Sequence, residues 1–266
     1  MGDLMRRRSN LALEINIQDP IFDPKVVDGC ILWLGADSLD GLSDGAGVSN
    51  WYDKSGYGHN AVAVNAPTFK KDYFGIGRHG VYFNAASSQY MSIARTADLE
   101  PTAGFTIISV LRSLGGYNYA ALIKKPYRTS GWSEPYVQWG ASVCSDSANE
   151  KPYVSFGYTS SNSRYVISSY ACRDSFGIYT FYYNKSVLRL YMNGVLWGTA
   201  NYSDSIDYTN ATDVAIGTRS TYSTGELLNA VVAELIMFNA GLSTSNLNTI
   251  LSGLNKKYGI PVSVVS

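Results

Sequence analysis

The chain has 266 residues, of which 45% are hydrophobic and 16% are charged, and its formal net charge is +0 at pH 7. This balance excludes a disordered chain and is typical of a globular protein with a large core. Because nucleic-acid binding requires a basic surface, the neutral balance also argues against nucleic acid as the main partner. No stretch approaches the ~20 apolar residues of a membrane-spanning helix, so we expect no membrane insertion.

The first 26 residues differ from the rest of the chain. They contain three consecutive basic residues, Arg6, Arg7 and Arg8, followed by a segment interrupted by two prolines. Proline breaks a helix, so we predict an extended arm over residues 1–26. We expect this arm to attach the protein to another subunit of an assembly, and a disordered leader is the alternative.

The cysteines and the amino-terminal sequence together bear on the compartment. Cys30, Cys144 and Cys172 are odd in number and widely spaced, which does not fit a disulfide framework and predicts free thiols in a reducing compartment. Glu14 and Asp19 interrupt the segment that would have to be continuously apolar in a signal peptide. We therefore expect no signal peptide and synthesis in a cytoplasm.

Short strands follow one another from about residue 27 onward. They are rich in β-branched and aromatic residues and are separated by segments rich in Gly, Ser, Asn and Asp. We predict strands within residues 30–34, 80–84, 89–93, 105–112, 136–139, 153–158, 165–170, 179–184, 214–217 and 230–238. Many short strands at this spacing indicate an all-β sandwich or barrel.

The clearest single element is a hairpin over residues 188–198. Its centre is Asn193-Gly194, which favours a type I′ turn because both central residues of that turn need positive φ. A two-residue turn would pair Met192 with Val195, Tyr191 with Leu196 and, farther along, Leu190 with Trp197. An isolated hairpin is only marginally stable, so a larger antiparallel sheet is implied.

One helix is predicted near the carboxyl end. Ser243 is a suitable N-cap, and Gly259 is a suitable end. Between them the apolar residues recur at helical spacing on one stripe, at Leu247, Ile250, Leu251, Leu254 and Tyr258.

The order of several motifs resembles the concanavalin A-like lectin/glucanase superfamily, in its laminin-G-like jelly-roll branch, as found in phage and viral structural proteins. The motifs are W-Y-D-K-S-G-Y-G-H-N-A, G-V-Y-F-N, F-T-I-I-S-V, L-Y-M-N-G, A-I-G-T-R, A-E-L-I-M-F-N and K-K-Y-G-I, which begin at residues 51, 80, 105, 190, 215, 233 and 256. The resemblance covers residues 27–260 and leaves residues 261–266 as a carboxyl-terminal tail.

This resemblance implies an all-β fold, a two-sheet antiparallel jelly-roll sandwich with one short C-terminal helix, to which the extended N-terminal arm is added. In the superfamily, the concave face and the loops at its rim are the usual carbohydrate-binding surface. Many relatives are non-catalytic modules on cell surfaces or on viral particles, and some bind calcium at the rim.

The residues needed for catalysis are absent from the sequence pattern. Glycoside hydrolysis uses two carboxylates at a fixed separation, and glucanases of this superfamily carry them as Glu-x-Asp-x-x-Glu or Glu-x-Asp-x-Glu on one strand. The chain has neither pattern. We interpret Glu234 as a structural carboxylate bonded to the backbone or to an arginine, and His59 as a structural hydrogen-bonding residue. We therefore expect a protein that is not an enzyme.

Three aspartates could form a calcium site. Asp40, Asp44 and Asp53 lie in or beside loops at the expected rim, and carboxylate oxygens suit calcium. The alternative is that they are ordinary turn residues. No other cofactor is expected.

Aromatic residues give the main hint of a ligand. Sugar rings present apolar C–H faces that aromatic side chains can cover. We predict a glycan-binding platform at Tyr117, Tyr119, Tyr127, Trp132 and Trp139, to which Tyr136, Tyr158, Tyr165 and Tyr170 could add. The alternative is that these residues pack sheet faces or subunit interfaces, where aromatics are also enriched.

These observations favour a non-catalytic structural protein of a virion, as a decoration, fibre or tail component. Its arm would bind other virion subunits, it would form a homo-oligomer, and its lectin-like domain would face outward toward a cell-surface glycan. A free-standing carbohydrate-binding lectin module is the alternative, and a glycan-degrading enzyme is the third hypothesis.

Overall fold

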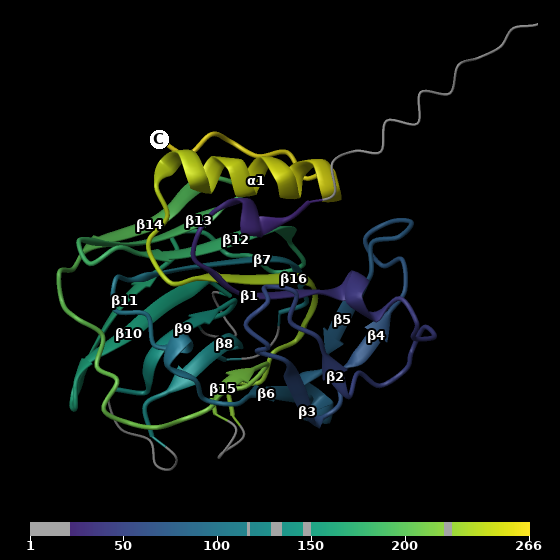
Figure 1. Cartoon of the computed structure of the whole chain (residues 1–266), viewed down its shortest axis with the longest axis horizontal. Coiled ribbons are helices and arrows are strands. Elements are labelled where there is room, and N and C mark those ends of the chain that lie inside the picture. Colours follow the sequence, from purple (N-terminus) through teal and green to yellow (C-terminus); the bar gives the residue numbers. More distant parts are fainter. Residues whose placement is uncertain (1–21, 116–117, 129–134, 146–149, 221–224) are drawn as a thin grey trace, which may run out of the picture.

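The computed structural model describes residues 22–115, 118–128, 135–145, 150–220 and 225–266. These residues form two eight-stranded antiparallel sheets stacked on each other, with one α-helix on the outside (Figure 1). The predicted two-sheet β-sandwich with a single carboxyl-terminal helix is confirmed. Within the described residues, no helix is both long and apolar enough to cross a membrane.

The first sheet, sheet A, has the strand order β14-β13-β12-β7-β16-β5-β4, and β1 also pairs with β16. Its strands are β1 (Cys30–Gly35), β4 (Thr68–Lys70), β5 (Gly80–Phe83), β7 (Phe105–Ser113), β12 (Phe176–Tyr183), β13 (Val187–Met192), β14 (Val195–Asn201) and β16 (Ala230–Phe238).

The second sheet, sheet B, has the strand order β11-β10-β9-β8-β15-β6-β3-β2. Its strands are β2 (Asn50–Trp51), β3 (Ala61–Asn65), β6 (Tyr90–Ile93), β8 (Ala121–Pro126), β9 (Val137–Ser142), β10 (Tyr153–Thr159), β11 (Asn162–Ile167) and β15 (Val214–Ile216). Every predicted strand segment contains a strand. The sequence pattern did not predict β2, β3 and β4, which are short, or β8, which carries two lysines and a proline.

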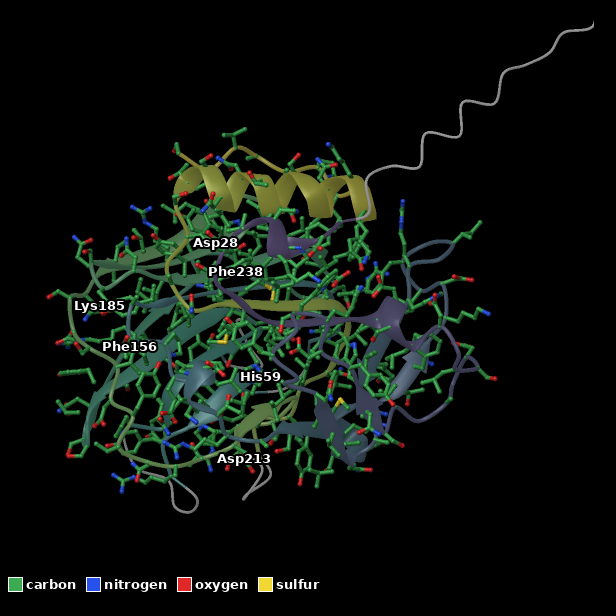
Figure 2. All side chains as sticks on the ribbon, in the orientation of Figure 1. Asp28, His59, Phe156, Lys185, Asp213 and Phe238 are labelled. Atoms are coloured by element: carbon green, nitrogen blue, oxygen red, sulfur yellow. The ribbon has the colours of Figure 1, made fainter. Side chains whose placement is uncertain are left out.

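Two apolar layers hold the sandwich together. The first lies between the sheets and includes Trp51, Trp139 and Phe156, all fully buried. The second lies on the outer face of sheet A, where Ile108 and Phe238 pack beneath the helix. Figure 2 shows Phe238 close to the helix and Phe156 deeper in the sandwich. Strands β7 and β16 are therefore covered on both faces, which explains their nearly continuous apolar sequences.

The helix α1 (Thr244–Tyr258) matches its prediction in detail. The Ser243 hydroxyl accepts a hydrogen bond from the backbone N–H of Asn246 at 3.2 Å, and Gly259 ends the helix with a φ of 66°. The predicted apolar stripe is the buried face of the helix. This stripe covers the outer face of sheet A.

The predicted hairpin is present, with one difference in register. Asn193 and Gly194 both have positive φ, at 50° and 79°, and Met192 pairs with Val195 as expected. Leu190 pairs with Gly198 and not with Trp197, because a β-bulge shifts the register between Leu190 and Tyr191. One extra residue in β14 was not visible from the alternation of apolar residues.

Both ends of the described chain pack on the helix side. Phe22 contacts the ring of Trp33 at a centroid distance of 6.0 Å, and the one-turn helix η1 (Pro24–Val26) follows it. At the other end, the N–H of Val265 donates to the Asn248 side-chain oxygen on α1 at 2.8 Å. The predicted tail over residues 261–266 therefore packs against the domain. Residues 1–21 of the predicted arm, with Arg6, Arg7 and Arg8, lie outside the described residues.

All three cysteines are buried, and none of them forms a disulfide. Burial raises the pKa of the Cys30 thiol to about 12, with a further contribution from Asp53 and Asp23. It raises the pKa of the Cys172 thiol to about 11. Free thiols were expected from their spacing, and their burial makes them unreactive at neutral pH.

Candidate ligand-binding site

A cavity of about 550 Å³ opens on the outer face of sheet B. It lies over β9, β10 and β11, on the side of the sandwich opposite to α1. We call it the tyrosine hollow, and it is lined by Tyr119, Tyr136, Val137, Ser145, Tyr153, Ser155, Ser163, Tyr165, Ile167 and Glu226.

The strand register produces the floor of the tyrosine hollow. Lys124 pairs with Gly140, Gly140 with Ser155, and Ser155 with Tyr165, so these four residues form one row across β8 to β11. They point away from the core because the alternating residues, such as Trp139, point into it. A Cβ on Gly140 would lie 2.8 Å from the Cγ of Lys124, so glycine leaves the space in which that long side chain lies.

Tyrosines form the walls. Tyr119, Tyr136 and Tyr165 are 50%, 43% and 56% exposed. The rings of Tyr119 and Tyr153 meet edge to face at a centroid distance of 6.0 Å, a favourable geometry for two aromatic rings. Half-exposed rings around a hollow leave apolar faces that a flat, partly apolar ligand could cover.

A buried ion pair lies beneath the walls. The Lys124 ammonium group donates to the Tyr153 hydroxyl at 2.7 Å and to the Glu226 carboxylate. Burial alone would lower the pKa of Lys124, but Tyr153 and Glu226 outweigh it and the pKa lies above its ordinary value. The guanidinium group of Arg219 is also buried nearby, and burial lowers its pKa against the opposing effects of Glu226, Tyr136 and Tyr153.

The predicted glycan residues divide into three groups. Tyr119 lines the tyrosine hollow. Tyr127 and Trp139 are instead core residues: the Tyr127 hydroxyl donates to Asp207 at 2.8 Å, and the Trp139 indole donates to the Leu99 carbonyl at 3.0 Å. A ligand could not reach them, which corrects the prediction for these two. Tyr117 and Trp132 lie outside the described residues.

Lys124, Tyr153 and Glu226 were not predicted from the sequence as parts of a site. One signal could have pointed to them, namely the pair Lys124-Lys125 inside the otherwise apolar strand β8. Two adjacent lysines in a buried strand project to opposite faces, and each requires its own anionic or carbonyl partners.

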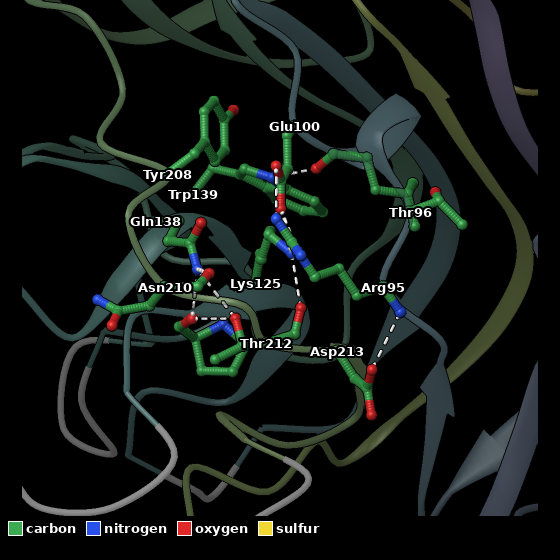
Figure 3. A network of polar contacts seen from close by, with 12 residues as sticks. Arg95, Thr96, Glu100, Lys125, Gln138, Trp139, Tyr208, Asn210, Thr212 and Asp213 are labelled. Carbon is green, nitrogen blue, oxygen red and sulfur yellow. Dashed lines mark hydrogen bonds and ion pairs between the residues drawn. The ribbon is translucent and has the colours of Figure 1, made fainter.

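Lys125 is the second lysine of that pair, and it lies in a network of polar contacts with Glu100 and Thr212 (Figure 3). Its ammonium group donates to the Thr212 carbonyl at 2.6 Å and pairs with Glu100 at 3.2 Å, and Glu100 in turn pairs with Arg95 at 2.8 Å. Burial lowers the pKa of Lys125 more than Glu100 raises it. Because these charges pair with one another, we interpret the network as structural.

The three predicted calcium ligands hold three separate turns. Asp40 pairs with His79 at 2.7 Å, and Asp44 accepts a hydrogen bond from the backbone of Lys71 at 2.9 Å. Asp53 accepts hydrogen bonds from Trp33, Ser55 and His59. In the part of the chain that the structure describes, no three His, Cys, Asp or Glu side chains gather as metal ligands would. The aspartates therefore act as turn residues in this arrangement.

Glu234 is a buried structural carboxylate, although its partners differ from those expected. It accepts from the Trp33 indole at 2.8 Å, from the Tyr258 hydroxyl at 2.9 Å and from the Lys257 ammonium group. These donors are side chains, and none is the backbone or an arginine. His59 also bonds structurally, with the Ile31 carbonyl at 2.8 Å and the Thr96 hydroxyl at 2.9 Å.

Comparison with known proteins supports the fold. No protein-family model and no curated protein matches the chain. Among solved structures, the binding domain of Paraclostridial Mosquitocidal Protein 1 superposes with a TM-score of 0.61 at 12% identity, over 85% of this chain and 52% of that one. The binding domain of botulinum neurotoxin DC in complex with SialylT gives 0.59 at 14% identity, over 85% and 51%.

Trypanosoma rangeli sialidase is a third match, with a TM-score of 0.55 at 12% identity, over 86% of this chain and 33% of the sialidase. The chain thus spans about half the length of the toxin domains and a third of the sialidase. At these identities the similarity shows the shared β-sandwich and not a shared ligand.

Proposed function

We propose that this protein is a non-catalytic, lectin-like module that binds a glycan in the tyrosine hollow. The observation that carries this proposal is the set of half-exposed rings of Tyr119, Tyr136 and Tyr165 around a cavity with a polar floor. The rings can cover the C–H faces of a sugar, and the serine hydroxyls and Glu226 can bond its hydroxyl groups. A purely apolar ligand would cover the Glu226 carboxylate without donating a hydrogen bond to it.

The similar structures support a glycan partner at a cell surface. The binding domain of botulinum neurotoxin DC has been solved in complex with SialylT and, separately, in complex with rat synaptotagmin II. Cell entry of botulinum neurotoxin type C depends on two ganglioside molecules. A receptor protein is thus a second kind of partner among these folds. The small, polar-floored hollow favours the glycan.

The chemistry of the hollow supports binding without catalysis. Glu226 is the one carboxylate among the described residues that line it. Hydrolysis of a glycosidic bond ordinarily needs two carboxylates that face each other across the bond. Glu226 is in addition paired with the Lys124 ammonium group.

We further infer that the protein is a structural component of a virion, attached through residues 1–26. The support is the Arg-rich start of the chain and the path by which the described part of the arm enters the domain. Phe22 and η1 pack on the α1 side of the sandwich. The tyrosine hollow opens over β9, β10 and β11, and Figure 1 shows these strands on the side away from α1. Attachment on the α1 side would leave the tyrosine hollow facing outward, and many copies would add avidity to weak glycan contacts.

The glycan proposal is tested on a glycan array with the wild type and Tyr165→Ala. Tyr52→Ala is the matched control, because Tyr52 is 52% exposed and lies outside the tyrosine hollow. We expect the wild type and the control to bind the same glycan, and Tyr165→Ala to bind it about tenfold more weakly. Equal binding by all three proteins would exclude the hollow as the site, and no binding to any glycan would overturn the lectin proposal.

The virion proposal is tested by light scattering on the full chain and on a deletion of residues 2–21, which leaves the packed segment from Phe22 intact. We expect the full chain to assemble and the deletion variant to be a folded monomer with unchanged glycan binding. Monomers in both cases, with equal binding, would overturn the anchoring role and favour a free-standing lectin.

A further inference from the structure

We propose that Glu226 determines which ligand enters the tyrosine hollow, by accepting a hydrogen bond from a sugar hydroxyl group. This inference rests on the proposed glycan binding and adds to it the residue and the ligand group that make the polar contact. It distinguishes Glu226 from a residue that only balances the charge of Lys124.

The Glu226 carboxylate can accept more hydrogen bonds than the described residues donate to it. Its Oε2 accepts from the Lys124 ammonium group, and no described residue donates to its Oε1. The Glu226 side chain lines the tyrosine hollow and remains 10% exposed, whereas the Lys124 side chain below it is 2% exposed. An ionised carboxylate has about four acceptor positions, so a ligand in the tyrosine hollow meets a strong acceptor.

The charges around Glu226 restrict the charge that a ligand group can carry there. The carboxylate of Glu226 shares its surroundings with two buried cations, Lys124 and Arg219. Because Lys124 already balances the charge of Glu226, a ligand amine would gain little net attraction there. A carboxylate or phosphate group has no hydrogen to donate to Oε1. A neutral donor remains, and in a hollow walled by tyrosines this is the hydroxyl group of a sugar.

The backbone at Glu226 and Tyr119 has an unusual conformation beside the tyrosine hollow. Glu226 and Tyr119 have φ values of 54° and 55°, the left-handed region that favours glycine. A hydrogen bond from the Ala121 N–H to the Glu226 carbonyl, at 2.8 Å, joins the two segments beside the hollow. Non-glycine residues in this conformation are costly and concentrate at ligand sites. Here two of them, from distant parts of the chain, line the same cavity.

The alternative is that Glu226 serves only as the counterion of Lys124. Glu226→Gln separates the two possibilities, because the amide oxygen can still accept from Lys124 while the charge and one acceptor are lost. Asp28→Asn is the matched control, since it removes the same charge at an exposed position near the helix, away from the tyrosine hollow (Figure 2). Circular dichroism and thermal unfolding establish that both variants are folded.

Binding is measured by calorimetry with cellotriose, maltotriose, mannotriose, N-acetylchitotriose and any further neutral glycan that the array identifies. We expect Glu226→Gln to bind the preferred probe at least tenfold more weakly than the wild type and Asp28→Asn to bind it equally well. Monodeoxy analogues of that probe provide the second readout. For the analogue that lacks the donated hydroxyl, the wild type and Glu226→Gln should bind equally, as in a double-mutant cycle.

The outcomes separate the two proposals. If Tyr165→Ala weakens binding and Glu226→Gln does not, the hollow binds glycan but Glu226 is only a counterion, and this inference is overturned. The same holds if every deoxy analogue keeps the tenfold difference. If no neutral glycan binds and only carboxylate-bearing glycans do, the donor assignment fails while the lectin proposal survives.

Discussion

The outer faces of the two sheets each contain a buried pair of a lysine and a glutamate, and the two pairs are built differently. On sheet A, both oxygens of Glu234 are used, Oε2 by the Trp33 indole and Oε1 by Lys257 and Tyr258. Beside sheet B, Glu226 accepts a hydrogen bond at Oε2 from Lys124, and no other donor to it is found among the described residues. Helix α1 covers the first pair, and the second lies under an open hollow.

The difference separates a structural carboxylate from one available to a ligand. At Glu234 the surrounding donors occupy the whole carboxylate, and Lys257 has a second anionic partner in Asp37 at 3.0 Å. Burial lowers the pKa of Lys257, but Glu234 and Asp37 raise it further, so that the lysine remains charged. This cluster fastens the helix to the sheet. At Glu226 no described residue donates to Oε1, and the side chain lines the tyrosine hollow, so this carboxylate oxygen is available to a ligand.

The largest expected effect comes from making the same substitution at both sites. In Glu234→Gln the amide NH₂ group must face a donor, either the Trp33 indole or the Lys257–Tyr258 pair, and we expect a loss of about 3–5 kcal/mol in the free energy of unfolding. In Glu226→Gln the amide oxygen can still face Lys124 and water can enter the hollow, so we expect a loss of only about 1–2 kcal/mol. Urea unfolding of both variants measures the difference, and equal losses would contradict the comparison.

A smaller effect on stability is expected from substituting glycine at two positions whose backbone has positive φ. Lys185 has a φ of 65° in the exposed turn between β12 and β13, and Lys185→Gly should stabilise the protein by up to about 1 kcal/mol without changing glycan binding. Tyr119→Gly relieves the same strain but loses the ring contact with Tyr153, so the two effects should nearly cancel in stability. Its glycan affinity should nevertheless fall severalfold.

Thermal unfolding and calorimetry give the two quantities for each variant. We expect Tyr119→Gly to lower the glycan affinity with little change in stability. We expect Lys185→Gly to change the stability alone. A strong loss of stability in Tyr119→Gly would mean that the ring is a structural element, and the argument from backbone strain would then fail.

The sequence predicted the parts of this molecule that depend on local patterns. The stripe of α1, its Ser243 cap and the turn at Asn193-Gly194 follow from periodicity and from the backbone that these residues adopt. The β-bulge next to Leu190 could not be predicted in this way, because one extra residue in a strand does not change the composition noticeably.

The candidate site was predicted less well than the fold because it depends on register. Trp139 and Gly140 are neighbours on β9, and only the pairing of strands decides that the tryptophan enters the core while the glycine lies under Lys124. A shift of one residue would exchange the two faces. Glu226 is more than a hundred residues from Lys124 in the chain, so no local pattern could join them.

The smallest expected effect concerns the thiols, which report on the two apolar layers separately. Cys30 lies in the layer under the helix, and Cys172 lies between the sheets. The pKa of each is raised by burial, to about 12 and about 11, from an ordinary value of 9.0. A raised pKa favours the protonated form in the folded state, so this contribution to stability is complete below about pH 9 and is lost as the pH rises toward the folded pKa values.

At pH 8 we therefore expect no change in stability from these groups and almost no reaction of either thiol with a soluble disulfide reagent, while all three cysteines react after unfolding in guanidinium. In Glu234→Gln, which loosens the helix from sheet A, Cys30 should react first and Cys172 should stay protected. Mass spectrometry of the labelled peptides identifies the order. Equal labelling of Cys30 and Cys172 would mean that the helix layer opens only when the whole sandwich unfolds, so that the Glu234 cluster stabilises both layers together and not the helix alone.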